Sequence, residues 1–244
     1  MEFKGRVVVV TGSGKGIGEG IARAFCEEGA SVIITSKHLD ECIRVATSMG
    51  RLKGRAIPIK CDISEIVEVK SLFAQIKKQF GRVDVLVNNA GIYPFAPFEK
   101  MTENDWKNVI DVNLNGTFYC TKAALELMTS GSIINISSIA GVRGFASMTH
   151  YCSTKGAIDS FTEALALELA PRIRVNAILP GLIITPGTQV LGKQMLNEFA
   201  KKIPMKRAGL PSDIANMALF LASEKASFIT GQNFIVDGGE TVSG

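Results

Sequence analysis

Short runs rich in Val and Ile alternate along this 244-residue chain with segments whose apolar residues recur at helical spacing. Seven runs are expected to be strands: 6–11, 31–35, 56–60, 83–87, 132–137, 173–179 and 233–236. The alternation predicts parallel strands joined by right-handed crossovers, and nearly continuous apolar runs predict a sheet that is covered on both faces. The sequence therefore predicts an α/β fold built on a doubly wound parallel sheet.

Composition limits the classes of protein that this chain can be. Its apolar share of 46% is ample for one core, so we expect one domain over residues 1–244. The formal charge of +4 includes no long block of like charge, so neither nucleic acid nor a membrane is expected as a partner. No apolar stretch is long enough to cross a bilayer or to form a secretory signal, which predicts a cytoplasmic protein.

Cysteine and histidine usage gives no sign of a metal. The five cysteines are odd in number and form no CxxC pair, so reduced and mostly buried thiols are expected: Cys26, Cys42, Cys61, Cys120 and Cys152. His38 and His150 are the only histidines, and they lie far apart in the sequence. We therefore expect no metal site.

A glycine-rich segment, TGSGKGIG, follows the first predicted strand and leads into an amphipathic helix. Glycine permits the tight turn and lets backbone N–H groups approach a pyrophosphate at the positive end of a helix. The strand before and the helix after favour this interpretation over an ordinary glycine-rich turn. The residues expected to bind the dinucleotide here are Gly12, Ser13, Lys15, Gly16, Ile17 and Gly18.

The second predicted strand ends without the acidic residue that would bind the ribose hydroxyls of NAD. It is followed by Ser36 and Lys37, which together with Lys15 offer a hydroxyl and two cations for a 2′-phosphate. NADP is therefore expected rather than NAD; the alternative is that both lysines are solvated surface charges. Asp62 and Ile63, just past the third strand, are expected beside the adenine; a simple turn there, with Ser64 as a helix cap, remains open.

Four polar residues are expected at the carboxyl edge of the sheet: Asn113, Ser138, Tyr151 and Lys155. Tyr151 and Lys155 are four residues apart, so on a helix they share one face. A cation about 4 Å from a phenol would lower its pKa from about 10 by roughly 3 units before desolvation opposes it. Lys155 is therefore expected to bring the pKa of Tyr151 towards neutrality.

Ser138 and Asn113 complete the expected catalytic group. Ser138 follows a predicted strand, where its hydroxyl can hold a substrate oxygen and stabilise developing negative charge. Asn113 is expected to anchor a water that relays protons to Lys155. Each residue alone could equally serve packing or capping, but the four together indicate proton transfer.

Together these motifs resemble the short-chain dehydrogenase/reductase family along nearly the whole chain. The resemblance covers the glycine loop, the catalytic tetrad and two further segments, whose cofactor-binding residues would be Asn89, Ala90, Gly91, Pro180, Gly181, Ile183 and Thr185. It implies a Rossmann-type sheet of seven parallel strands, 4-pro-S hydride transfer and cofactor contacts by Tyr151 and Lys155. It also implies a homotetramer that buries residues 231–232 and 237–239.

The substrate pocket is expected to be lined by residues 93–98, 142–145 and 186–203. The last segment is amphipathic, which suggests either a mobile helical lid or a fixed surface helix: Val190, Leu191, Met195, Leu196 and Phe199 supply its apolar face. His150 either contacts the substrate or is an ordinary loop residue.

The resemblance implies an NADP-dependent oxidoreductase acting on a carbonyl or secondary alcohol. Within the family the chain is similar both to 3-oxoacyl-acyl-carrier-protein reductases and to sugar and alcohol dehydrogenases. The uncharged connection 128–132 lacks the basic residue that carrier-protein reductases often have there, although Arg172 and Arg174 remain candidate carrier contacts. A protein that binds NADP(H) as a redox sensor without catalysis is the alternative from another class.

Overall fold

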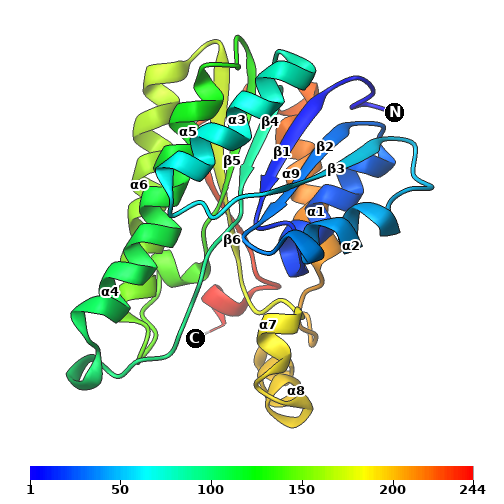
Figure 1. Cartoon of the computed structure of the whole chain (residues 1–244). Helices are drawn as coiled ribbons and strands as arrows, with labels where there is room; N and C mark the ends of the chain where they lie inside the picture. The colour runs from blue at the N-terminus through cyan, green and yellow to red at the C-terminus, as the bar shows by residue number, and fades with distance from the viewer. Residues whose placement is uncertain (244) are drawn as a thin grey trace.

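The predicted strands form one parallel sheet in the computed structural model, which describes residues 1–243 (Figure 1). The strands are β1 (Val7–Thr11), β2 (Ser31–Ser36), β3 (Arg55–Lys60), β4 (Val85–Asn88), β5 (Gly131–Ile136), β6 (Ile173–Pro180) and β7 (Asn233–Val236). Their order is β3-β2-β1-β4-β5-β6-β7. This is the predicted Rossmann-type arrangement, and the strand order reverses between β1 and β4, where such sheets bind ligands.

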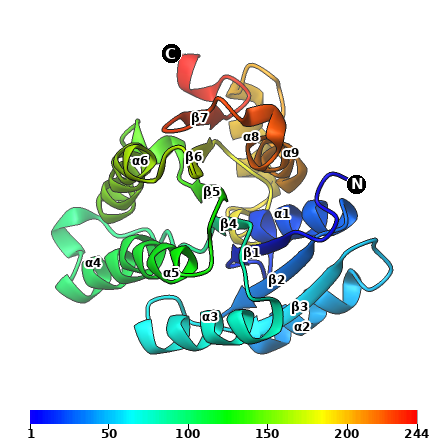
Figure 2. The same ribbon diagram turned by 90° about the horizontal axis from the view of Figure 1, so that it is seen from above.

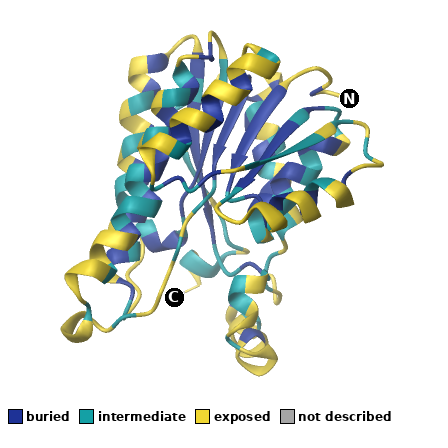
Figure 3. Cartoon of the chain, viewed as in Figure 1, coloured by how far each residue is buried: buried dark blue, intermediate teal, exposed yellow. Residues whose placement is uncertain are grey.

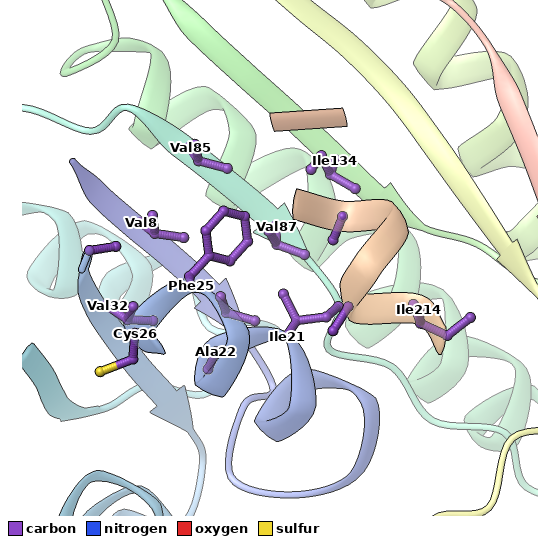
Figure 4. Close-up of a cluster of buried hydrophobic side chains, with 14 of the residues drawn as sticks. Val8, Ile21, Ala22, Phe25, Cys26, Val32, Val85, Val87, Ile134 and Ile214 are labelled. Atoms are coloured by element: carbon purple, nitrogen blue, oxygen red, sulfur yellow. The ribbon is translucent and has the colours of Figure 1, made fainter. Parts of the chain in front are cut away.

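Helices cover both faces of the sheet (Figure 2). One layer contains α1 (Gly16–Glu27), α2 (Leu39–Ser48) and α9 (Pro211–Ala222), and the other contains α3 (Ile66–Phe80), α5 (Gly116–Leu125) and α6 (Thr149–Leu169). Side chains along β1 alternate between the layers: Val8 and Val10 pack into the first core, whereas Val7 and Val9 pack into the second. Figure 4 shows Val8 packed with Ile21 and Phe25 in the first core. This double burial explains why the strands are apolar along their whole length.

A chain of buried amides and hydroxyls joins the central strands to the second helix layer. The Asn88 amide donates to Asn135 Oδ1 and to Thr121 Oγ1, at 2.9 Å each. The amide of Asn135 in turn donates to Thr162 Oγ1 at 2.9 Å. These bonds tie β4 and β5 to α5 and α6, so the polar groups support the sheet next to the site.

Segment 186–203 forms two helices, α7 (Pro186–Gln189) and α8 (Lys193–Lys202), separated at Gly192 with φ of 81°. In Figure 1 they project below the sheet, on the side where the strands end, and Figure 3 shows α8 largely exposed. Leu196 is buried, whereas Val190, Met195 and Phe199 are exposed. The apolar face of the predicted lid is thus only partly packed, and its mobility stays a prediction.

The structure of residues 1–243 bears on the cysteines, on clusters of metal ligands and on membrane-spanning helices. Four of the five cysteines are buried, Cys152 is half-buried, and all five are free thiols. Within this range no three His, Cys, Asp or Glu side chains cluster as metal ligands. No helix in the described part of the chain has the length and apolar character needed to cross a membrane.

Candidate active site

The glycine loop after β1 is fastened to the end of β4. The Thr11 hydroxyl accepts hydrogen bonds from the backbone N–H groups of Asn89 (3.0 Å) and Ala90 (3.1 Å). The Asn89 amide donates to the carbonyl oxygens of Thr11 (2.8 Å) and Gly12 (3.1 Å). Gly12 has φ of 63°, and a Cβ there would lie 2.7 Å from the Cα of Ala90. Only glycine fits this approach, which brings Asn89, Ala90 and Gly91 beside the loop.

The start of α1 has the donor groups that an anionic pyrophosphate requires. Lys15 is the N-cap residue, and no side chain accepts a hydrogen bond at this helix end. The backbone N–H groups of Gly16, Ile17 and Gly18 therefore lie at the positive end of α1 without a side-chain cap. Ser13 is arranged differently: its buried hydroxyl donates to the Val10 carbonyl at 2.7 Å and accepts from the Thr35 N–H at 3.0 Å. The Ser13 side chain thus joins β1 to β2.

At the end of β2, an acidic residue occupies the place where the sequence predicted phosphate ligands. Glu41, in the first turn of α2, accepts from Lys15 Nζ at 3.1 Å and from Ser36 Oγ at 3.0 Å. Hydrogen bonds from Lys15 and Ser36 keep the pKa of Glu41 below its usual value, although burial opposes this effect. Lys37 lies beside them and is exposed. No local sequence pattern predicts that Glu41 lies here.

The residues predicted beside the adenine form a turn after β3. One carboxylate oxygen of Asp62 accepts from both the backbone N–H (3.0 Å) and the hydroxyl (2.7 Å) of Ser64. Ile63 is buried against Gly116, where a Cβ would lie 2.6 Å from Ile63 Cδ1. The turn expected from the sequence is therefore present, but the N-cap residue of α3 is Glu65, so Ser64 is not the helix cap. Adenine binding by Asp62 and Ile63 stays a prediction.

The catalytic pair lies on the first turns of α6. Lys155 Nζ is 5.6 Å from the centroid of the Tyr151 ring and donates to the Ile136 carbonyl at 2.7 Å. Burial lowers the pKa of Lys155 to about 8, and the nearby charge of Asp159 opposes this shift. Burial raises the pKa of Tyr151 to about 12, against a smaller effect of its hydrogen bond with Ser138.

The pKa of Tyr151 therefore differs from the sequence-based expectation. In the chain alone, desolvation of the phenol outweighs any stabilisation of its charged form. The Lys155 ammonium is directed to a backbone carbonyl rather than to the phenol, and it is itself buried. The geometry still brings Tyr151, Lys155 and Ser138 together, as the sequence predicted.

Asn113 lies in a π-helical turn, Asp111–Asn115, between α4 (Glu103–Ile110) and α5. Its amide nitrogen donates to the Ile92 carbonyl (2.9 Å) and to Thr154 Oγ1 (3.2 Å), and its oxygen accepts from the Ile92 N–H (2.8 Å). The amide thus holds the segment after β4 against α6. A Cβ on Gly91 would be 3.3 Å from Asn113 Oδ1 and 3.8 Å from Lys155 Nζ. The four predicted catalytic residues are therefore gathered at one edge, while the water relay stays a prediction.

Asp159 lies one helical turn beyond Lys155 and was missed in the sequence analysis. Both of its carboxylate oxygens are buried without a hydrogen-bond partner, and the hydroxyl of Ser137 donates to the Lys155 carbonyl at 3.1 Å. Burial raises the pKa of Asp159 to about 6. The i, i+4, i+8 spacing of Tyr151, Lys155 and Asp159 is the sequence pattern that could have identified it.

The turn after β6 lies against the glycine loop. A Cβ on Gly16, which has φ of 61°, would lie 3.3 Å from side-chain carbons of Thr185. Thr185 caps α7 by accepting from the Thr188 N–H at 3.2 Å, and Ile183 is buried. The glycine loop and the turn after β6, both predicted to bind the dinucleotide, are thus neighbours.

The carboxyl-terminal segment supports this same turn, a feature that the sequence analysis did not detect. Gly181 donates its N–H to the Val236 carbonyl at 3.1 Å, and a Cβ on Gly181 would lie 2.7 Å from Asp237 Cβ. The Glu240 carboxylate accepts from the Leu182 N–H at 3.2 Å. Residues near the end of the chain therefore contact the turn that contains Pro180 and Gly181.

Tyr93 connects the catalytic tyrosine to α7. Its ring lies 6.0 Å from that of Tyr151, centroid to centroid, in an edge-on arrangement at 61°. A Cβ on Gly187 would collide with Tyr93 Oη, so α7 approaches the site closely only because position 187 is glycine. Segments 93–98 and 186–203 therefore meet beside Tyr151, as predicted for pocket-lining elements.

Three further residues were candidate contacts for a substrate or a carrier protein: His150, Arg172 and Arg174. His150 is fully buried in the first turn of α6, not in a loop, and its Nδ1 accepts from the Tyr151 N–H at 2.9 Å. Arg174 donates to the carbonyls of Leu221 (2.6 Å) and Ser223 (3.0 Å). Within one chain, Arg172 and Arg174 lie at the opposite end of α6 from Tyr151.

Known proteins resemble this chain in sequence and in fold. A family model described as enoyl-(acyl carrier protein) reductase matches residues 12–241. The chain belongs to the short-chain dehydrogenase/reductase family. As a member of the family, it is an oxidoreductase that acts on an alcohol or carbonyl group and uses a nicotinamide cofactor.

Three relatives show how far the similarity extends. The meso-2,3-butanediol dehydrogenase of Serratia marcescens is 37% identical, over 100% of this chain and 97% of the relative. The 3-oxoacyl-[acyl-carrier-protein] reductase of Chlamydia pneumoniae is 41% identical, over 97% of each chain. A solved short-chain dehydrogenase/reductase from Brucella melitensis, described as glucose/ribitol dehydrogenase, is 41% identical over 98% of both chains, with a TM-score of 0.94. The similarity therefore spans nearly the whole length of this short-chain dehydrogenase/reductase.

Proposed function

We propose that this protein transfers hydride between NADP(H) and a ketone or secondary alcohol, with Tyr151 donating the proton in reduction and accepting it in oxidation. The observation that carries the proposal is the group formed by buried Lys155 with half-buried Tyr151 and Ser138 at the carboxyl edge of the sheet. A bound nicotinamide supplies or accepts the hydride. The chain orients the substrate oxygen and moves its proton.

Each polar residue has a distinct part in this proposal. Ser138 holds the substrate oxygen close to the Tyr151 hydroxyl, whose pKa the Ser138 hydroxyl lowers against the larger effect of burial. Lys155, fixed to the Ile136 carbonyl, places a positive charge beside the phenol, which stabilises phenolate when it forms. Asn113 keeps the segment after β4 in place by its two bonds to Ile92. The site therefore positions a proton donor before substrate arrives.

The dinucleotide is proposed to lie along the edge from β2 to β6. The glycine loop, the uncapped start of α1 and the adjacent turn after β6 form a continuous set of N–H donors and hydroxyls suited to a pyrophosphate. The proposed contacts are Gly12, Ser13, Lys15, Gly16, Ile17, Gly18, Ser36, Lys37, Asp62, Ile63, Asn89, Ala90, Gly91, Tyr151, Lys155, Pro180, Gly181, Ile183 and Thr185. NADP is favoured over NAD by Lys15 and Lys37 and because no acid directly follows β2 in the sequence.

The protein is further proposed to be a single domain and a cytoplasmic homotetramer. Its exposed apolar side chains include Trp106 on α4, Phe118 on α5 and Ile235 on the edge strand β7. Exposed apolar groups on three elements favour burial between copies of the chain. Light scattering coupled to size-exclusion chromatography tests this point, and a monomer at micromolar concentration would contradict it.

A substrate panel tests the proposed activity. The names of relatives favour vicinal diols, sugars and 3-oxoacyl thioesters, so the panel comprises meso-2,3-butanediol, aldoses, simple secondary alcohols and ketones, and a 3-oxoacyl thioester. Each is assayed with NADH and NADPH in parallel by nicotinamide absorbance. Turnover of a ketone or secondary alcohol with NADPH preferred is expected. Tight NADP(H) binding without turnover of any compound would instead favour a redox sensor.

A further inference from the structure

The carboxylate of Glu41 holds two of the side chains that would otherwise be available to a 2′-phosphate. Its Oε1 lies 3.1 Å from Lys15 Nζ, and its Oε2 accepts from Ser36 Oγ at 3.0 Å. Each oxygen therefore bonds one of the two residues. The ammonium and the hydroxyl are engaged by an internal anion.

This carboxylate is fixed against the glycine loop. A Cβ on Gly14 would lie 2.7 Å from Glu41 Oε2 and 2.9 Å from Glu41 Cβ. The Glu41 side chain is 23% exposed, compared with 59% for Lys15. Glu41 is therefore the more confined partner of the pair, and it lies over the loop.

Other charged side chains lie near Glu41 and the glycine loop. Arg44, on the same helix, donates to the Gly14 carbonyl at 2.6 Å and pairs with Glu19 at 3.0 Å. Arg44 is thus engaged by the loop backbone and by Glu19. Lys60, on the neighbouring strand beside Ser36, pairs with Glu68, so the remaining charges next to Ser36 include Lys15, Lys37 and Glu41.

We propose that Glu41 shifts the cofactor preference of the protein away from NADP(H) and towards NAD(H). A 2′-phosphate must replace the carboxylate at Lys15 and Ser36 and is repelled by it, because both groups are anionic. A 2′-hydroxyl is neutral and can donate a hydrogen bond to the carboxylate. Glu41 therefore weakens the NADP preference that Lys15 and Lys37 would otherwise give. This inference rests on the proposed function, since it assumes that a dinucleotide binds at this edge.

Two adenosine fragments separate the effect from catalysis. Adenosine 2′,5′-bisphosphate and adenosine 5′-monophosphate differ by the 2′-phosphate, so the ratio of their Kd values isolates recognition of that group. Isothermal titration calorimetry measures both Kd values for the wild-type protein, Glu41→Gln and Glu41→Ala. Asp40→Asn is the matched control, because Asp40 is exposed in the same helical turn and loses the same charge.

Removing the Glu41 charge is expected to shift the Kd ratio about tenfold in favour of the 2′-phosphate fragment, which corresponds to about 1.4 kcal/mol. Both Glu41 variants should shift it in this direction, and Asp40→Asn should stay within about twofold. Far-UV circular dichroism establishes that each variant is folded, and two different substitutions guard against misfolding of one.

Other outcomes separate the inference from the proposed function. An unchanged ratio, or weaker binding of the bisphosphate in both folded variants, would overturn the role of Glu41 and show that it organises Lys15 and Ser36 instead. The proposed function would then stand if the wild-type protein binds the fragments. Failure of the wild-type protein to bind either fragment or NADP(H) would overturn the proposed function, and this inference with it.

Discussion

The ammonium of Lys155 lies 5.6 Å from the centroid of the Tyr151 ring and donates a 2.7 Å hydrogen bond to the carbonyl oxygen of Ile136. This bond spans from α6 to the end of β5, so the sheet itself fixes where the cation lies. Lys155 is only 4% exposed. Cation and phenol are thus held together by backbone geometry rather than by an exposed ion pair.

The ionisation of Tyr151 can be measured in the ligand-free protein. Because burial raises the pKa of Tyr151 to about 12, we expect no phenolate from this residue up to about pH 10. The measurement is the difference in phenolate absorbance between the wild-type protein and Tyr151→Phe during an alkaline titration. An ionisation below pH 9 that disappears in Tyr151→Phe would instead support the lower pKa that the sequence suggested.

Asp159 should make stability depend on pH. Burial raises its pKa in the folded protein from 3.8 to about 6, so the folded state holds this proton more tightly than the unfolded state does. Its contribution to the free energy of unfolding is present below pH 4 and is lost as pH rises through 6. Asp159→Asn cannot ionise and should lack this loss, which is on the order of 1–3 kcal/mol.

Urea unfolding at pH 4.5 and pH 7 measures the Asp159 effect. Glu168→Gln is the matched control, because Glu168 is exposed on the same helix and should leave the pH dependence close to that of the wild-type protein. Identical pH dependence of Asp159→Asn and the wild-type protein would show that the Asp159 carboxyl is already solvated.

Tyr93 and Gly187 should be energetically coupled. A methyl group in Gly187→Ala would collide with Tyr93 Oη and displace α7, so KM for substrate should rise about fivefold. In a Tyr93→Phe background the oxygen is absent, and the same substitution should change KM by less than about twofold. Steady-state kinetics of the four proteins measure the coupling. Additive effects of the two substitutions on KM would refute the contact.

The buried amide chain should matter for stability. Asn135→Ala removes the acceptor of the Asn88 amide and the donor to Thr162, leaving buried polar groups unpaired. The free energy of unfolding should fall by about 2–4 kcal/mol. Chemical denaturation measures this change. Asn104→Ala, at an exposed position of α4, should alter stability by less than about 0.5 kcal/mol; equal effects of both substitutions would contradict the role of the network.

Local sequence patterns predicted the sheet, and they predicted that Tyr151, Lys155 and Ser138 lie near one another. Strand positions follow from runs such as 7–10, which are buried on both faces, and no strand boundary differs from its prediction by more than two residues. Tyr151 and Lys155 follow from helical spacing, and Ser138 from its place after a strand. These features depend on neighbours in sequence, so they can be predicted without coordinates.

The features that were missed arise from contacts between distant segments. Glu41 meets Lys15 across 26 residues, and Glu240 meets Leu182 across 58. Neither pairing has a local pattern. The raised pKa of Tyr151 also escaped prediction, because burial depends on the whole fold around the phenol. Charge near the end of β2 was predicted from Lys15 and Lys37 alone, and the acid on α2 changes that balance.

The most direct test of the central claim is the rate of NADPH oxidation with a ketone substrate in the wild-type protein and in Tyr151→Phe. The phenylalanine variant should remain folded and bind adenosine 2′,5′-bisphosphate with unchanged Kd, while kcat falls by about a thousandfold or more, because it lacks the proton donor. A folded Tyr151→Phe protein that retains kcat within about tenfold of the wild-type value would contradict the assignment of Tyr151 as the proton donor.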